Sequence, residues 1–589
     1  MGLMSSEIQK NNKDYFNKEL NSLIDSFELF NKKHPFFSKE INLTDKGSND
    51  PHINLLLESF AFLTSKIQQQ IDRNTQQIES NILDNICPIS NLPIPSKTII
   101  QFSYDERQIS SLLEDMTIPK GTEVFLENDN KIKCTFSTES ELRLLPFKID
   151  HISFEKDRYL CNEYLKSSII LNLKSVGCNF FEILNYNKLK LFINSRDNKS
   201  TKLMDIIFDN NTKIYLYNKF SNELTQVRID DFKISTFNEY IDTDGIPPDS
   251  HAGMRLLNDF STFKSKFNFI EFTNISYNNY INELDIIFSF SDDIFLDFHL
   301  SKDMFLLNCV SSINIYKKIS EPIKLDNFNL SYKFFSNSSN KKNEFFYYTK
   351  EIFYIRDDIN EIYQIKNIKD LFDNFTNQND DDIFYEIKRD YLDLSEIKFS
   401  FYKKNGQMIF PNDALIYANI YVHDGTESEI IEENSILYTE YSAPISNIKI
   451  LIKPTKYINK VNNNMINWKI ISSFNFNFMS FYKSEEILKK INNLIFITFN
   501  FNNELYSTYK AIKDVKSDLK FMKSNKNSFK SITLFYEIKF IINKESLENK
   551  SLILLGNVLK CLLKCYIYYV FEILIILLDE DGSVIYRCY

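Results

Sequence analysis

Apolar side chains in the first hundred residues recur at three- and four-residue spacing, which is the period of an amphipathic helix. One series runs from Leu20 to Phe30 and ends before His34-Pro35. A second series starts at Asp50-Pro51, where aspartate can cap free amide groups and proline suits the first helical position. These signals predict a helical region at the start of the chain.

The second series carries an apolar stripe that is wider and longer than a lone surface helix needs. A stripe of this kind requires a partner helix, either in a bundle shared between chains or in the chain's own core, and the sequence leaves both open. Asn74 with Gln77 predicts a new cap and a further helix that ends at Pro88. We define the apolar stripe, our candidate interface, as Leu56, Phe60, Leu63, Ile67 and Ile71.

After Pro95 the period changes to short runs rich in Ile, Phe, Val and Tyr, broken by Gly, Asn and Asp, which predicts strands. Turn-rich or polar breaks lie at Asp242 to Ser250 and at Ser336 to Asn343, and either could be a domain boundary. The predicted strands include Thr98 to Ser103, Glu123 to Leu126, Lys131 to Thr138 and Ser167 to Leu173.

The end of the chain predicts a helix from Leu554 to Ile567, a strand from Val570 to Leu578, a turn and a last strand through Ile585. The fold class is therefore α+β, with an N-terminal helical region followed by mostly antiparallel β-rich domains and a C-terminal helix-hairpin unit. We expect a helical region at 1–97, β-rich domains at 98–245 and 246–335, and an α+β domain at 336–589.

Composition describes a folded chain: 589 residues with 43% hydrophobic and 25% charged residues. The net charge of -10 is spread along the chain and argues against nucleic acid as the main partner. The amino terminus lacks the apolar stretch of a signal peptide, and the apolar segment Leu552 to Leu578 is interrupted by Lys560, Lys564 and Glu572, so we expect it to be buried core.

Candidate chemistry is weak. Asp242 to Gly245 superficially resembles a calcium loop, but Tyr240 and His251 occupy positions that need oxygen ligands, and the acidic run Asp380 to Asp382 is typical of a solvated loop. Cys561 and Cys565 share a helix face without a further ligand at metal-binding spacing, and the eight cysteines contain no CxxC pair. The chain contains no GxSxG, HExxH, GxGxxG or GxxxxGK[ST]. We therefore expect no catalytic residue, metal or cofactor, although a β-domain hydrolase with two paired carboxylates stays an alternative.

The segment DPHINLLLESFAFLTSKIQQQID closely resembles the signature of the TssF family, also called VasA or ImpG. The resemblance continues in order through Tyr15 to Leu20, Ile118 to Glu123, Leu257 to Phe272 and Gly556 to Leu559. Ser311 departs from the family, whose members usually have proline there. Family-motif residues outside the apolar stripe are Asp50, Pro51, His52, Glu58, Phe62, Pro93, Pro95 and Gly121.

The resemblance implies a non-enzymatic, structural wedge subunit of the type VI secretion baseplate in the bacterial cytoplasm, similar to wedge proteins of contractile phage tails. It implies that two copies pair with one TssG, self-associate in the wedge, and join TssE and TssK around the VgrG hub to start tube and sheath growth for effector delivery. Contact with the inner membrane would be indirect, through the docked membrane complex. A subunit of another phage-tail-like contractile particle is the alternative.

Overall fold

The computed structural model describes two compact units, Met1–Ile82 and Leu83–Tyr589. Residues that it leaves undescribed are 1, 35, 37–42, 45–46, 49–50, 106, 108–115, 128–132, 162, 177–187, 195–198, 210, 220, 238–239, 241–246, 248–249, 275–282, 297, 327–328, 338–343, 357–360, 369–382, 390–396, 404–413, 460–463, 475–510, 525–530, 544–550, 567–571 and 589.

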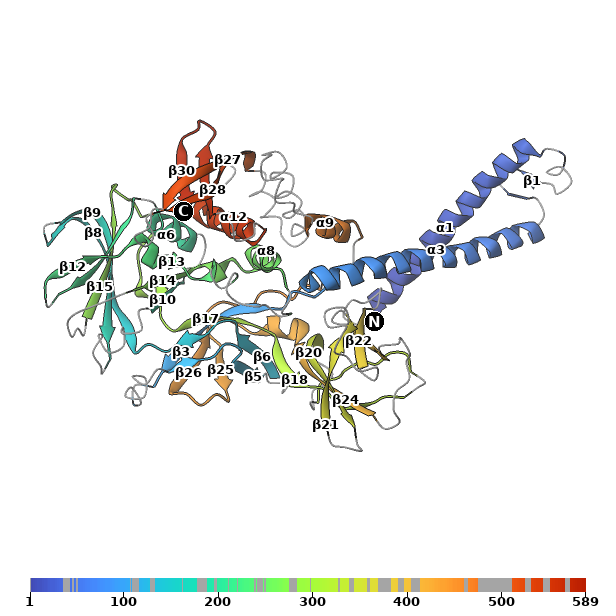
Figure 1. The fold of residues 1–589 in the computed structure, drawn as a ribbon, viewed down its shortest axis with the longest axis horizontal. Coiled ribbons are helices and arrows are strands. Elements are labelled where there is room, and N and C mark those ends of the chain that lie inside the picture. The colour runs from blue at the N-terminus through green and yellow to red at the C-terminus, as the bar shows by residue number, and fades with distance from the viewer. Residues whose placement is uncertain are drawn as a thin grey trace. The chain divides into compact units, whose positions relative to one another are not determined.

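Two long helices form most of the first unit. Helix α1 spans Gly2–Lys33 and helix α3 spans Pro51–Ile86, with the short strands β1 (Leu43–Thr44) and β2 (Gly47–Ser48) paired between them (Figure 1). The predicted helical region is confirmed. The predicted cap at Asn74 is wrong, because α3 continues through it without a break, and the Asn74 side chain instead accepts a hydrogen bond from Gln70 one turn earlier.

A closed barrel forms the centre of the second unit, and strands far apart in sequence build it. Its inside is filled by apolar side chains such as Ile100, Phe102, Val124 and Phe136. The barrel order is β17 (Cys309–Ile313), β3 (Lys97–Tyr104), β26 (Ile445–Ile450), β25 (Ile436–Thr439), β5 (Glu123–Glu127) and β6 (Lys133–Thr138).

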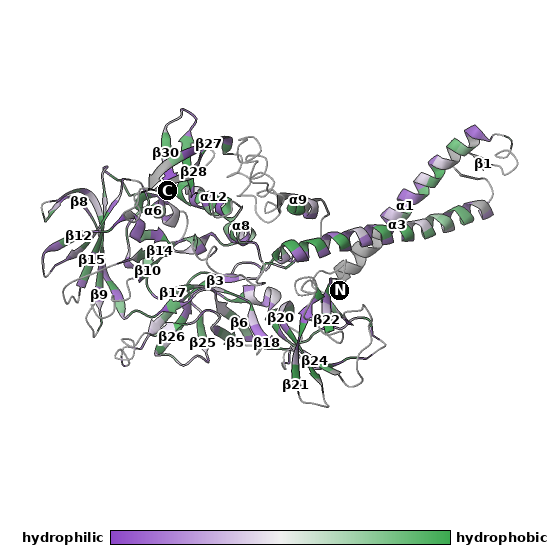
Figure 2. Cartoon of the chain, viewed as in Figure 1, coloured by the Kyte–Doolittle hydropathy of each residue, from purple (hydrophilic) through white to green (hydrophobic). Residues whose placement is uncertain are grey.

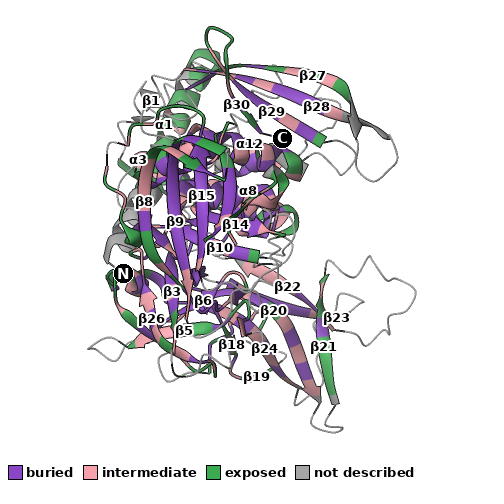
Figure 3. Ribbon diagram, turned by 90° about the vertical axis from the view of Figure 1, so that its left-hand side faces the viewer, coloured by how far each residue is buried: buried purple, intermediate pink, exposed green. Residues whose placement is uncertain are grey.

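Two further sheets share one apolar core that includes Leu171, Leu191, Ile286 and Phe272. Strand β15 is buried along nearly its whole length (Figure 3). The first sheet is β12 (Glu223–Gln226), β11 (Lys213–Asn218), β15 (Glu283–Phe290), β9 (Glu163–Ser175) and β8 (Phe147–Leu160). The second is β13 (Phe232–Ile234), β14 (Phe269–Thr273), β10 (Lys188–Ile193) and β16 (Phe305–Leu306), and helix α6 (Lys199–Ile207) packs on the same core.

A seven-stranded sheet is inserted in the chain between barrel strands β17 and β25. Its order is β18 (Tyr316–Ile319), β24 (Ala414–His423), β20 (Phe345–Arg356), β21 (Glu361–Asn367), β22 (Ile383–Arg389) and β23 (Ile397–Lys403), with β19 (Ile323–Lys324) also on β24. Strands β4 (Thr117–Ile118) and β7 (Leu142–Arg143) form a small antiparallel pair, and in the sequence they flank the barrel strands β5 and β6.

The chain ends in a four-stranded sheet of β27 (Ile512–Ser524), β28 (Ser531–Ile542), β29 (Glu572–Asp579) and β30 (Val584–Cys588). Helix α12 (Leu552–Tyr566) packs on it and on helix α8 (Ala252–Thr262). The predicted closing helix and hairpin are confirmed, and the apolar segment at Leu552 is buried core as expected. Helix α9 (Asn464–Phe474) precedes this sheet.

Most described strand pairs are antiparallel, and β21–β22 and β28–β29 are parallel. The α+β class with mostly antiparallel sheets is thus confirmed. The four-part division of the chain stays a prediction. The barrel joins strands from residues 97–138, 309–313 and 436–450, which fall in different parts of that division. Each helix in the described part of the chain is too short or too polar to span a membrane.

Candidate functional site

The apolar stripe lies on α3 and faces solvent. Its five side chains are between 50% and 69% exposed, whereas Ala61 and Ser65 on the same helix are 0% and 4% exposed. Figure 2 shows hydrophobic residues, in green, along the length of α3. In unit 1 the Tyr15 hydroxyl of α1 donates to Asp72 of α3 at 2.7 Å. Before Leu83, which is buried in unit 2, helix α3 therefore buries small and polar side chains and leaves most of its large apolar ones exposed, which is the reverse of an ordinary surface helix.

The family-motif residues do not gather in one place. Asp50 lies outside the described residues; Pro51, His52, Glu58 and Phe62 are exposed on α3, with the Lys66 ammonium 5.7 Å from the Phe62 ring centroid. Pro93 and Pro95 are buried in the segment that leads into the barrel. Gly121 has a φ of +83°, which favours glycine in the turn before β5.

A buried ionic ring joins the barrel to α8 and to the 3-10 helix η4 (Lys264–Phe267). We define the ionic ring as Lys97, Glu139, Asp259 and Lys266. The Lys97 ammonium lies 3.0 Å from Glu139 and 2.6 Å from Asp259, and the Lys266 ammonium lies 2.9 Å and 2.8 Å from the same carboxylates. Each cation therefore bridges both anions, and the ring is neutral.

Electrostatics keeps both carboxylates of the ionic ring charged. Burial alone would raise the pKa of Glu139, but the ammonium groups of Lys266 and Lys97 outweigh burial and lower it well below the usual range. The same balance lowers the pKa of Asp259, and the two carboxylates raise the pKa of Lys266 against the effect of burial. A general acid needs a raised pKa, so this carboxylate pair is unsuited to the paired-carboxylate chemistry of a hydrolase.

Two hydroxyl groups complete the hydrogen bonding of the ring. Tyr240 donates to Asp259 at 2.5 Å, and Ser311 of β17 donates to Glu139. The Ser311 backbone carbonyl also accepts from the Glu139 amide at 2.9 Å. Ser311, at the position where family members usually have proline, thus donates a side-chain hydrogen bond that proline could not make.

A second polar cluster, the Asp424 cluster, fastens β24 to the barrel. The Asp424 carboxylate accepts from the Tyr316 hydroxyl at 2.6 Å, from the Asn314 amide at 2.7 Å and from the Thr135 backbone at 2.9 Å. Burial raises the pKa of Asp424, and it lowers the pKa of the neighbouring His423 to about 4. The neutral His423 accepts from the Gly425 backbone at 3.0 Å, so this cluster has a structural role.

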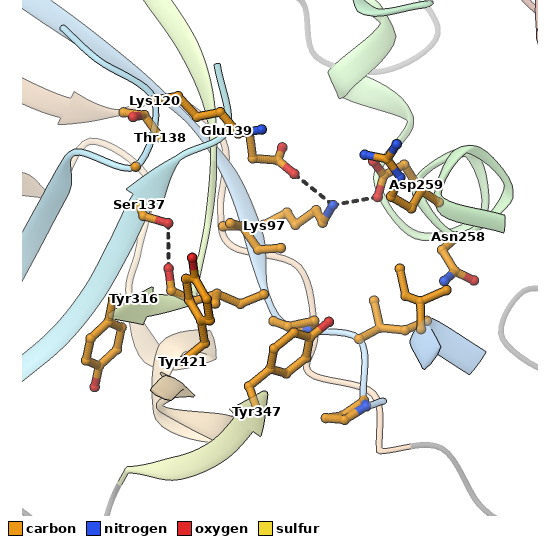
Figure 4. Close-up of a pocket in the computed structure, with 18 of the residues that line it drawn as sticks. Lys97, Lys120, Ser137, Thr138, Glu139, Asn258, Asp259, Tyr316, Tyr347 and Tyr421 are labelled. Atoms are coloured by element: carbon orange, nitrogen blue, oxygen red, sulfur yellow. Dashed lines mark hydrogen bonds and ion pairs between the residues drawn. The ribbon is translucent and has the colours of Figure 1, made fainter. Parts of the chain in front are cut away.

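A cavity of about 460 Å³ opens above the ionic ring (Figure 4). The barrel strands, α8 and the strands β18, β20 and β24 all contribute to its lining. Tyr347 and Tyr421 stand side by side along one wall, and Lys97 reaches between Glu139 and Asp259. Pro93, Pro95 and Gly121 of the family motif also line the cavity.

In the described part of the chain, no group of three or more His, Cys, Asp or Glu side chains is arranged so that it could hold a metal ion. The calcium-loop residues Asp242 to Gly245 and the run Asp380 to Asp382 lie outside the described residues. Cys561 is buried in the core between α8 and α12, and Cys565 packs against that core.

Sequence patterns missed the ionic ring and Asp424. Lys97 and Asp259 stand 162 positions apart, and Asn314 and Asp424 stand 110 apart, so no local spacing could connect them. The one available signal was the resemblance itself, whose segment Leu257 to Phe272 contains Asp259 and Lys266.

The profile of the family described as "Type VI secretion system, TssF" matches residues 8–588. A curated relative, the type VI secretion system component TssF1 of Pseudomonas aeruginosa strain PAO1, is 21% identical over 325 residues, which are 53% of this chain and 52% of the relative. The chain thus matches about half the length of that relative.

Two solved structures share the fold. A chain of the type VI secretion system TssK-TssF-TssG baseplate subcomplex has a TM-score of 0.72 at 15% identity, over 91% of this chain and 98% of that one. A chain of the baseplate complex from the type VI secretion system has a TM-score of 0.56 at 14% identity, over 98% of both. Because the family profile covers nearly the whole sequence and the fold agrees, this chain belongs to the TssF family of the type VI secretion system.

Proposed function

We propose that this chain is a structural, non-enzymatic wedge subunit of a type VI secretion baseplate, and that it assembles through the apolar stripe of α3. The observation that carries the proposal is the inverted polarity of the part of α3 in unit 1, where the apolar stripe is exposed while Ala61 and Ser65 are buried. Exposed apolar patches of this kind mark protein interfaces. Family membership and the fold shared with baseplate chains support the assignment.

The stripe suits a helical bundle with other chains. Leu56, Phe60, Leu63 and Ile67 follow each other at four- and three-residue spacing, which is the pattern of a helix-helix seam. Burying five such side chains that are now at least half exposed would contribute roughly 1 kcal/mol each. The partners that we propose are TssG-like and TssK-like proteins, with two copies of this chain per TssG, and then TssE and the VgrG hub.

The proposed place of action is the bacterial cytoplasm, in a baseplate that docks at the inner membrane through other proteins. In this role the chain needs no substrate or cofactor. The wedge would rearrange when the sheath contracts, and the division of the chain into several domains that we predict would allow such movement.

The test is a pull-down of the tagged chain from cells that express its whole gene cluster, with Phe60→Asp compared with Ser59→Asp. Ser59 is exposed on the same helix next to Phe60 but outside the apolar stripe, so the control introduces the same charge at the same level of α3. We expect TssG- and TssK-like proteins to be recovered with wild type and Ser59→Asp and lost with Phe60→Asp. Equal recovery with all three would refute the stripe as the interface, and a lone chain in every case would refute the baseplate role.

A further inference from the structure

The cavity above the ionic ring carries a strong positive surplus in an acidic chain. Six basic and two acidic side chains are among its described lining residues, while the whole chain has a net charge of -10. The ionic ring is neutral and forms the floor, so the surplus of four charges comes from Lys120, Arg255, Lys317 and Lys350. A cavity with one sign of charge concentrates ligands of the other sign.

Two of these cations have no acidic partner among the described residues. Within the described parts of the chain neither Lys317 of β18 nor Lys350 of β20 makes an ion pair, and both are exposed. The Lys317 ammonium lies 6.0 Å from the ring centroid of Tyr421, its register partner on β24. Both lysines are thus available to an anion that enters the cavity.

Strand β20 is irregular where it lines the cavity. Its register with β24 shifts between Phe346 and Tyr348 and again between Thr349 and Glu351, so that Tyr347 and Lys350 are the two extra residues. Bulges re-aim side chains and concentrate beside functional sites. Here both bulged residues belong to the cavity lining, and Tyr347 is 2% exposed.

We propose that this cavity binds an acidic segment of a partner protein, with its carboxylates on Lys317 and Lys350 and its apolar atoms against Tyr347 and Tyr421. The surplus cations stand on four separate segments of the chain around an open cavity with tyrosines in its wall, and this arrangement suits an extended peptide with several carboxylates. A compact phosphate would instead need donors that converge on one point. The proposal rests on the proposed function only in that the partner is another baseplate protein.

The experiment measures fluorescence anisotropy of labelled hexaglutamate with the purified full-length chain at low salt. Lys317→Gln/Lys350→Gln is compared with Lys318→Gln/Lys366→Gln, which removes two lysines from β18 and β21 of the same sheet outside the cavity lining. We expect about a 10-fold weaker affinity for the first pair only, because each exposed ion pair contributes a few-fold. Lys317→Arg/Lys350→Arg keeps the charge and is expected to restore binding, and thermal melting checks that all variants are folded.

Equal loss in both glutamine pairs, or no binding of hexaglutamate above a hexaglutamine control, would overturn the proposal. If tripolyphosphate binds at the two lysines and hexaglutamate does not, the cavity is a site for small anions, and the peptide proposal is overturned. The Phe60→Asp variant separates this proposal from the proposed function, because it is expected to lose partner capture and to bind hexaglutamate normally. Loss of hexaglutamate binding in that folded variant would also contradict the proposal.

Discussion

Replacing Lys266 by methionine removes one of the two cations of the ionic ring and leaves Glu139 and Asp259 to share Lys97. Lys266 makes contacts of 2.9 Å and 2.8 Å, and the four side chains of the ring are 5% to 15% exposed. At an effective dielectric constant of about 20, each contact carries roughly 6 kcal/mol of Coulomb attraction, most of which offsets the desolvation of the ions. Because the variant leaves an uncompensated buried charge, we expect it to lose about 3–5 kcal/mol.

Hydrogen exchange measured by mass spectrometry on β3 and α8 gives this loss as a local free energy of opening. The matched control is Lys513→Met, which breaks a 2.6 Å pair with Glu580 whose side chains are 50% and 43% exposed, and should cost less than about 1 kcal/mol. Lys266→Met combined with Glu139→Gln restores neutrality and should cost less than the sum of the two single changes. Equal effects of Lys266→Met and Lys513→Met would refute the reasoning.

The same variant has a defined pH dependence. The lowered pKa values of Glu139 and Asp259 mean that these groups stabilise the folded wild type above their unfolded pKa values of 4.5 and 3.8, and that this contribution is lost as the pH falls further. Without Lys266 the folded pKa values of these two carboxyl groups are expected to rise. As the pH falls, protonation then removes the uncompensated negative charge from the variant. The difference between wild type and variant should therefore be largest at pH 7 and shrink towards pH 4.

Three further results are expected near Asp424, each checked by thermal melting or hydrogen exchange. Gly425→Ala should lower the free energy of unfolding more than Gly121→Ala. Both glycines have positive φ, but a Cβ at Gly425 would lie 3.0 Å from the Phe345 ring, whereas a Cβ at Gly121 would meet nothing within 4 Å. Equal losses in the two variants would contradict the packing argument. Burial lowers the pKa of His423 to about 4 in the folded chain, against 6.5 in the unfolded chain. Neutral His423 therefore stabilises the fold fully above pH 6.5, and up to roughly 3 kcal/mol of unfolding free energy is lost as the pH falls towards 4. His423→Gln should make the stability less dependent on pH in this range. Asp424→Ala leaves three buried donors without their acceptor and should cost several kcal/mol, about 1–3 per donor, whereas an effect under about 1 kcal/mol would argue against the cluster.

Local patterns in the sequence predicted much of the fold. The helical period placed α1 and α3, and the strand-like runs placed β3, β5, β6 and β9 within a few residues of their bounds. The helix and hairpin at the end of the chain were also predicted. These elements could be read because helix and strand periods act over neighbouring residues. The false cap at Asn74 shows the limit, since a capping residue inside a helix can simply bond along the same face.

The sequence by itself determined the family, the helical and β-rich parts, and the presence of an apolar stripe on the second helix. Tertiary structure alone decided that this stripe is exposed, that six strands from distant segments close into a barrel, and that the four charges of the ionic ring meet. The physical reason is the range of the interactions. Periodicity depends on residues a few positions apart, whereas strand pairing, burial and ion pairing depend on residues that approach only after the chain has folded.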